Sequence, residues 1–139
     1  MNSKKPILLV EDDEIDVMTF TRAIKELNVG NRIESAPDGE QALELLEDPS
    51  VVKPCLIVLD LNMPRMNGLE FLKSIKSIKP LKLIPVVVLT TSGEVSDRRE
   101  CFDLGAAGYM IKPMEYSKFK DLVKKIMDYW SINEFPDLD

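Results

Sequence analysis

Histidine is absent from the 139 residues of this chain, and cysteine occurs only twice. Without histidine, the chain has no imidazole for acid-base catalysis, no phosphohistidine of its own and no histidine-rich metal site. Cys55 lies in an apolar run and Cys101 in a predicted helix, and no CxxC spacing suggests zinc. We therefore expect both cysteines to be packed thiols.

The chain also lacks an excess of positive charge and long apolar runs. Its 18 Lys+Arg residues are outnumbered by 24 Asp+Glu residues, giving a net charge of −6. Nucleic acid and anionic membrane surfaces are therefore poor partners. No apolar run approaches the roughly 20 residues of a membrane-spanning helix, and no signal peptide is visible at the N-terminus. We expect a cytoplasmic protein that binds neither nucleic acid nor membrane.

Short aliphatic runs alternate with stretches of helical period along the chain. Five runs predict strands, and three of these are continuously apolar, as in strands that are covered on both faces. The five are Ile7–Val10, Arg32–Ala36, Cys55–Leu59, Pro85–Leu89 and Gly108–Ile111. Because no repeat or linker interrupts the alternation, it predicts a parallel sheet in one α/β domain.

Five segments carry the helical signal, with different strengths. The clearest has apolar residues at steps of three and four after an acidic start at Asp13: Val17, Phe20, Ile24 and Leu27. Others begin near Asp38 and Gly68, and a broad apolar stripe runs from Phe119 to Trp130.

Residues 95–104 form the weakest of the five helical segments. The predicted inward side mixes Arg98 and Arg99 with three apolar residues, Val95, Cys101 and Phe102. We expect this helix to be loosely packed and therefore mobile.

Five βα units predict a doubly wound, five-stranded parallel sheet between two layers of helices. Ligands of such folds bind beyond the carboxyl ends of the strands. The residues at those ends are Glu11–Asp13, Asp60, Thr90–Thr91 and Lys112–Pro113. Because neighbouring strands lie ~4.8 Å apart, these carboxylates, hydroxyls and ammonium group can share one small site.

Acidic residues are concentrated between positions 11 and 16, namely Glu11, Asp12, Asp13, Glu14 and Asp16. Each close pair repels by ~1 kcal/mol in water, and a cation would relieve that repulsion. Oxygen ligands select a hard cation, and a shallow site with room for water suits Mg²⁺ better than Ca²⁺. We assign Glu11 and Asp12 to the metal and the other three to the positive end of the first helix.

Asp60 precedes a loop that Pro64 and Gly68 shape. With acids after a neighbouring strand and Lys112 after another, its carboxylate is a candidate nucleophile that forms an acyl phosphate. Mg²⁺ and Lys112 would stabilise the charge on the phosphoryl oxygens. We expect a cis bond between Lys112 and Pro113 that points the amine inward; the alternative is a plain trans turn with a solvated Lys112.

Taken in order, these motifs resemble the receiver domain of two-component response regulators over roughly positions 6 to 127. The matching motifs are Glu11-Asp12, Asp60 with Asn62-Met63-Pro64 and Asn67-Gly68, Val88-Leu89-Thr90-Thr91, Leu104-Gly105-Ala106 and Lys112-Pro113. The resemblance implies a flavodoxin-like strand order 2-1-3-4-5 with five helices.

The resemblance also implies the chemistry of the site. Asp60 would accept a phosphoryl group from a phosphohistidine on a sensor histidine kinase or a phosphotransfer protein. Asp12 would bind Mg²⁺ directly, Glu11 mainly through water, and Asn62 through its backbone carbonyl. Glu11 departs from the commoner Asp, but its longer side chain still reaches a metal-bound water.

The switch residues follow from the same resemblance. Thr90 and Lys112 would contact the phosphoryl oxygens, and Tyr109 would turn inward as Thr90 moves. Thr91 stands where the family often has alanine, so we predict no lifetime for the phosphorylated form. Such a protein is a signalling switch rather than an enzyme, because it catalyses only its own phosphorylation and dephosphorylation.

We interpret residues 1–130 as the receiver domain and 131–139 as a tail that is too short for a DNA-binding module. Output would then be contact with a downstream protein, through the fourth helix, fifth strand and fifth helix that the family uses. Residues 129–136 resemble the end of stand-alone regulators paired with phytochrome-type kinases. This apolar tail either mediates a homodimer or is frayed or folded back on its own chain.

Two other functions fit parts of the pattern. Phosphatases of the haloacid-dehalogenase type use D-x-D, but Asn62 stands where the second Asp acts as general acid. A pseudo-receiver would only bind other proteins, and the intact Asp60, Asp12, Thr90 and Lys112 disfavour it. Nucleotide binding lacks support because neither G-x-G-x-x-G nor G-x-x-x-x-G-K-[ST] occurs.

Overall fold

A parallel sheet forms the centre of the computed structural model, which describes residues 5–136 and 138. Its strand order is β2-β1-β3-β4-β5, as expected. The strands are β1 (Ile7–Val10), β2 (Ile33–Ala36), β3 (Leu56–Leu59), β4 (Val86–Thr90) and β5 (Gly108–Ile111). The predicted bounds are therefore correct to within one residue, and Thr90 ends β4 instead of following it.

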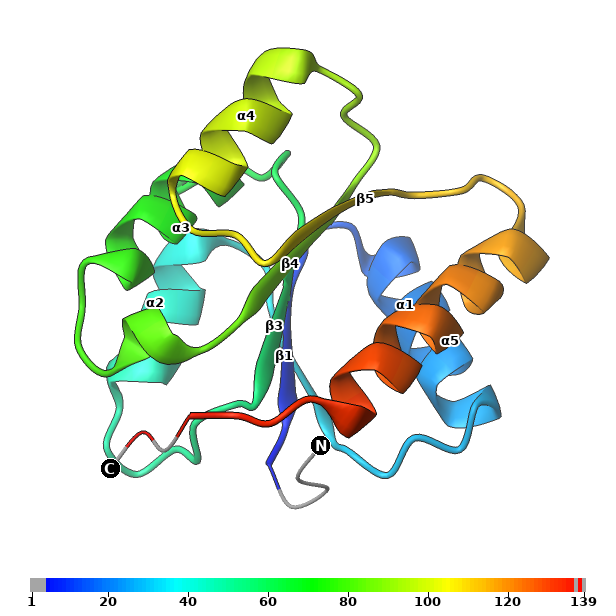
Figure 1. The fold of residues 1–139 in the computed structure, drawn as a ribbon, viewed down its shortest axis with the longest axis horizontal. Helices are drawn as coiled ribbons and strands as arrows, with labels where there is room; N and C mark the ends of the chain where they lie inside the picture. The colour runs from blue at the N-terminus through cyan, green and yellow to red at the C-terminus, as the bar shows by residue number, and fades with distance from the viewer. Residues whose placement is uncertain (1–4, 137, 139) are drawn as a thin grey trace.

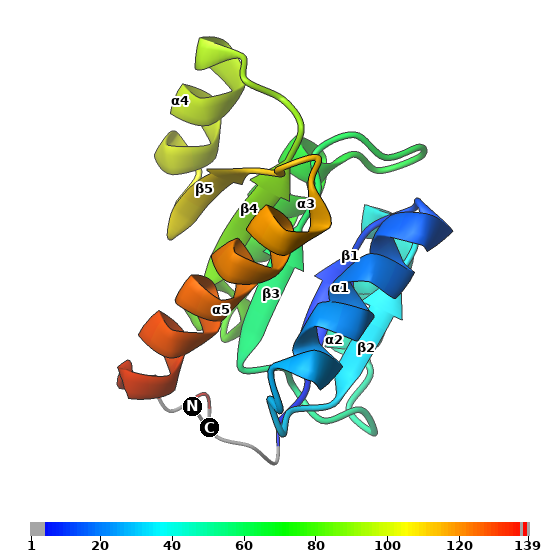
Figure 2. The ribbon, with the colours of Figure 1, turned by 90° about the vertical axis from the view of Figure 1, so that its right-hand side faces the viewer.

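In the described residues, five α-helices cover the two faces of the sheet, as Figure 1 shows. They are α1 (Glu14–Glu26), α2 (Gly39–Glu47), α3 (Gly68–Lys76), α4 (Val95–Asp103) and α5 (Tyr116–Ile132), and a short 3-10 helix, η1 (Leu81–Leu83), precedes β4. Helices α1 and α5 lie on one face, and α2, α3 and α4 on the other (Figures 1 and 2). The predicted three-layer, doubly wound architecture is confirmed.

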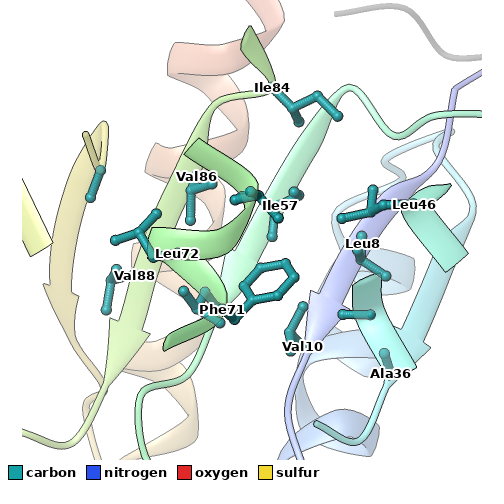
Figure 3. Close-up of a cluster of buried hydrophobic side chains, with 14 of the residues drawn as sticks. Leu8, Val10, Ala36, Leu46, Ile57, Phe71, Leu72, Ile84, Val86 and Val88 are labelled. Atoms are coloured by element: carbon teal, nitrogen blue, oxygen red, sulfur yellow. The ribbon is translucent and has the colours of Figure 1, made fainter. Parts of the chain in front are cut away.

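Two hydrophobic clusters, one on each face of the sheet, hold the layers together. Under α2 and α3, Leu72 lies beside Val86 and Val88, and Phe71 lies between β3 and β1 (Figure 3). On the other face, Phe20 of α1 and Val123 of α5 pack in the second cluster. Burying one such side chain contributes roughly 1.5–3 kcal/mol. The three central strands are buried along their whole length, as their continuous apolar runs predict.

Side-chain caps fix where three of the helices begin. The carboxylate of Asp13 accepts hydrogen bonds from the backbone N–H groups of Ile15 and Asp16 at the start of α1. Asp38 caps α2, and Asn67 with Glu70 forms a capping box on α3. Each cap stabilises its helix by about 1 kcal/mol. These caps lie at the carboxyl ends of the strands and so fix the loops there.

Helix α4 is packed more weakly than the other helices. Among its residues only Cys101 is buried, and no side chain caps its N-terminus. The predicted loose packing is confirmed, whereas its mobility stays a prediction. The inward placement of Val95 and Phe102 is wrong, because both are exposed. The buried face of α4 is narrower than the sequence pattern indicates.

The C-terminal tail folds back on its own chain. The rings of Trp130 and Phe135 lie 5.8 Å apart, and Phe135 packs against the cluster under α1 and α5. Leu138 packs against the cluster on the opposite face, so the tail crosses below the strands, as Figure 1 shows. This arrangement is one of the two alternatives that the sequence leaves open.

Both cysteines are free and buried, as expected. Within the part of the chain that the structure describes, no helix is sufficiently long and apolar to span a membrane.

Candidate functional site

The strand register brings the predicted site residues to one edge of the sheet. Val10 pairs with Leu59, so Glu11 and Asp60 follow at neighbouring positions, and the Asp60 N–H donates to the Val10 carbonyl at 3.0 Å. At the other strands, the Lys112 N–H donates to the Thr90 carbonyl at 2.8 Å. The carboxyl ends of β1, β3, β4 and β5 therefore surround one site.

Three carboxylates form a cluster that suits a divalent cation. One oxygen each from Glu11, Asp12 and Asp60 lies within 4.8 Å of the other two. Glu11 and Asp60 are 4% and 6% exposed, whereas Asp12 is exposed, so the cluster opens to solvent on one side. Three oxygen donors with room for water match the requirements of a hard cation such as Mg²⁺ or Mn²⁺.

The ammonium group of Lys112 lies among acidic side chains. It donates a hydrogen bond to Oε1 of Glu11, and its Nζ lies 3.2 Å from Oδ2 of Asp16 and 3.9 Å from Oδ1 of Asp60. Lys112 therefore points into the site, as predicted. The predicted cis bond to Pro113 is wrong, because the cis peptide bond among the described residues joins Lys79 to Pro80. The trans chain already directs the amine inward from the end of β5.

Burial dominates the electrostatics of the site. It raises the pKa of Glu11 to about 7, against the hydrogen bond from Lys112, and the nearby Asp60 charge raises it further. Burial also raises the pKa of Asp60, whereas the charge of Lys112 and the Thr90 side chain oppose that shift. Burial by itself would lower the pKa of Lys112, but Glu11 and Asp60 outweigh it and the net shift is upward. A divalent cation would stabilise both buried carboxylates in their charged form, so the donor set fits such an ion.

Two glycines hold the loop after β3 close to the rest of the site. A Cβ on Gly68 would lie 2.6 Å from the carbonyl oxygen of Asp60. A Cβ on Gly39 would lie 2.8 Å from the carbonyl oxygen of Met66. The Gly68 N–H also donates to the Leu61 carbonyl at 3.1 Å. In this loop the Asn62 backbone forms a hydrogen bond that lowers the pKa of Asp60, which places that backbone beside the carboxylate.

Hydrogen bonds link Thr90 to Tyr109 through Ser92. The buried Thr90 accepts a hydrogen bond from the Ser92 N–H at 3.3 Å, and the Tyr109 hydroxyl donates to the Ser92 carbonyl at 2.8 Å. The Ser92 hydroxyl in turn donates to Asp97 in the first turn of α4 at 2.7 Å. Tyr109 is therefore connected to both the β4 end and α4.

Sequence reasoning missed three residues of this arrangement. Asp16 is assigned to the helix start, and it does lie in the first turn of α1, but it also pairs with Lys112. The available signal was its place in the acidic run that follows the first strand, close to the predicted site. Ser92 and Asp97 carry no comparable signal, because a polar loop residue and an acid in a first turn are common in any α/β protein.

Comparison with known proteins identifies the class of this fold and site. Residues 7–125 match the sequence pattern of the response regulator receiver domain family. The chain belongs to this family, whose members are signalling switches of two-component systems and bind a divalent metal.

Two relatives show how far the similarity extends. The chain is 39% identical to the probable methanogenesis regulatory protein FilR2 of Methanothrix harundinacea, over 89% of this chain and 82% of FilR2. It is 34% identical to the response regulator Rcp1 of Synechocystis, over 93% and 90% of the two chains.

Solved structures of other proteins share this fold. The phosphorylated cyanobacterial phytochrome response regulator RcpA superposes with a TM-score of 0.90 at 35% identity, covering 96% of this chain and 99% of RcpA. The Mn²⁺-bound form of Rcp1 gives a TM-score of 0.88 at 33% identity, with the same coverage. The chain is thus a receiver domain homologous to phytochrome response regulators.

Proposed function

We propose that the Asp60 carboxylate accepts a phosphoryl group in a Mg²⁺-dependent reaction. One oxygen of Asp60 would attack phosphorus in line while the bond from phosphorus to the donor breaks. The observation that carries this proposal is the convergence of Asp60 with Glu11, Asp12 and the ammonium of Lys112 at one strand edge. The phosphorylated state of the similar RcpA supports it.

The remaining site residues have roles that fit their positions. Asp12 would bind the cation directly, Glu11 mainly through water, and Asn62 through its backbone carbonyl. Thr90 and Lys112 would bind the phosphoryl oxygens. Mg²⁺ is proposed because the donors are all oxygen and one side of the cluster is open to water. The Mn²⁺ in the Rcp1 structure is a comparable hard cation.

The phosphoryl donor in this proposal is a sensor histidine kinase, of phytochrome type, or a phosphotransfer protein. Exposed apolar side chains next to the site support docking of a protein there. Ile15 and Met114 line a hollow together with Asp16, Thr91 and Lys112. Exposed apolar side chains that gather on a surface are typical of protein interaction sites. Phytochrome response regulators such as RcpA supply the parallel.

Phosphorylation would signal by shifting an existing equilibrium between two conformations of the receiver. Ser92 is hydrogen-bonded to Thr90 and Tyr109, and its hydroxyl donates to Asp97 of α4. These bonds link the site to the most weakly packed of the described helices. A downstream protein would then recognise the α4–β5–α5 surface. We include the cytosol in the proposal because both thiols are free.

The proposal divides the chain into a receiver at residues 1–130 and a tail at 131–139, although α5 continues to Ile132. It also includes a homodimer formed through α5 and the tail. Trp130 and Phe135 are used within the chain, but Tyr129 and Ile132 are exposed and apolar. Those two side chains are available for contact with a second copy.

The test is incubation with acetyl phosphate and Mg²⁺, followed by measurement of the intact mass. We expect the mass of one added phosphoryl group in the wild type. No mass should be added when a chelator is present from the start of the incubation, or when Asp60→Asn is used. Uptake of the same mass by Asp60→Asn would show that another residue is the acceptor.

A further inference from the structure

Asp16 contacts Lys112 from a different element than the other acidic residues. Its carboxylate projects from the first turn of α1 and places Oδ2 3.2 Å from Nζ of Lys112. Lys112 is 11% exposed and lies between this carboxylate, Glu11 and Asp60. An ammonium group has three donors, so contacts with Glu11 and Asp16 leave one donor for the Asp60 side.

Among the acidic partners of Lys112, Asp16 is the one outside the carboxylate cluster. Glu11 and Asp60 belong to the three residues whose oxygens lie within 4.8 Å of one another, whereas Asp16 does not. A cation bound by the cluster would share the charge of Glu11 and Asp60 and would repel the nearby ammonium. Asp16 would keep its full attraction for Lys112 under those conditions.

We propose that Asp16 is a positioning residue that keeps Lys112 beside Asp60 when the metal is bound. This inference rests on the proposed function, in which Asp60 forms a bond to phosphorus while the bond between phosphorus and acetate breaks and acetate leaves. Asp16 gains and loses no proton in that step. It holds the ammonium so that the third N–H is available to the phosphoryl oxygens from the start of the reaction.

The kinetic test compares Asp16→Asn with Glu14→Gln at saturating Mg²⁺. Glu14 lies in the same first turn and is exposed, and it is not among the ion-pair partners of Lys112. With acetyl phosphate as donor, Asp16→Asn should be phosphorylated about three- to fivefold more slowly, the range for one partly exposed ion pair. Glu14→Gln should match the wild type, and Asp16→Glu should recover most of the rate.

A spectroscopic measurement separates positioning from a general effect on structure. In the Mg²⁺-loaded protein, the ¹⁵N signal of the Lys112 ammonium should be protected from rapid exchange with water. That protection should persist in Glu14→Gln and disappear in Asp16→Asn. A wild-type rate or a retained ammonium signal in Asp16→Asn would overturn the inference, as would equal slowing of Glu14→Gln.

The two proposals fail in different ways. If the wild type takes up no phosphoryl group, the proposed function is wrong. If the wild type is labelled on Asp60 and Asp16→Asn reacts at the same rate, only the role of Asp16 is wrong.

Discussion

The buried carboxylate of Glu11 should make the stability of the metal-free protein depend on pH. Burial raises its pKa from 4.5 to about 7, so the folded state binds a proton at Glu11 more tightly than the unfolded state does. Protonated Glu11 therefore stabilises the folded state relative to charged Glu11. This stabilisation is fully present below about pH 4.5 and is lost as the pH rises through about 7. The full change corresponds to about 3 kcal/mol.

Glu11→Gln isolates this effect because glutamine has a similar shape and does not titrate. Other carboxylates contribute to acid unfolding in both proteins, so the informative quantity is the difference between them. Relative to the wild type, Glu11→Gln should gain about 3 kcal/mol in free energy of unfolding between about pH 4.5 and pH 8. Urea unfolding in a chelator, followed through the single tryptophan Trp130, measures this difference.

Mg²⁺ provides the complementary test. A cation bound by charged Glu11 removes most of the cost of burying that charge, so saturating Mg²⁺ should stabilise the wild type more at pH 8 than at about pH 5. In Glu11→Gln, the stabilisation by Mg²⁺ should differ less between these two pH values. Parallel pH profiles for the two metal-free proteins would refute the reasoning about burial.

Three further outcomes concern packing and assembly. Gly68→Ala would place a Cβ 2.6 Å from the Asp60 carbonyl oxygen, so it should cost about 1–3 kcal/mol and slow phosphorylation. Gly93→Ala, with no atom within 4 Å of its Cβ, is the control. Phe71→Ala should cost about 3–5 kcal/mol in urea unfolding, since Phe71 is fully buried. If the proposed dimer forms, light scattering should detect a dimer of the wild type and a monomer of Ile132→Asp. A wild type that stays monomeric at high concentration, phosphorylated or not, would contradict the dimer.

Much of the fold can be read from the sequence because both faces of the central strands are buried. Short, continuous apolar runs between polar turns, such as Ile7–Val10, are typical of such strands, because a buried helix would need a longer run. The parallel arrangement then places the residues that follow each strand at one edge, so the positions of Asp60 and Lys112 could be predicted together. The register then aligns the carboxyl ends of neighbouring strands, so a residue that follows one strand lies beside the residue that follows the next.

Features that depend on side-chain direction were harder to predict. The inward face of α4 was misplaced because its alternating charged and apolar residues fit several helix orientations, and contact with the sheet selects the one that buries Cys101. The contact between Asp16 and Lys112 joins residues far apart in sequence, and it depends on the angle of α1 to the sheet. No local pattern specifies that angle.

Identification of the phosphorylated residue tests the central claim most directly. Borohydride reduces an acyl phosphate on aspartate to homoserine, which peptide mass spectrometry can locate after treatment with acetyl phosphate and Mg²⁺. The proposed site predicts homoserine at position 60 alone, and none when Mg²⁺ is chelated. Homoserine at position 12 or 13, or at no position in a protein that binds Mg²⁺, would contradict the assignment of Asp60 as the acceptor.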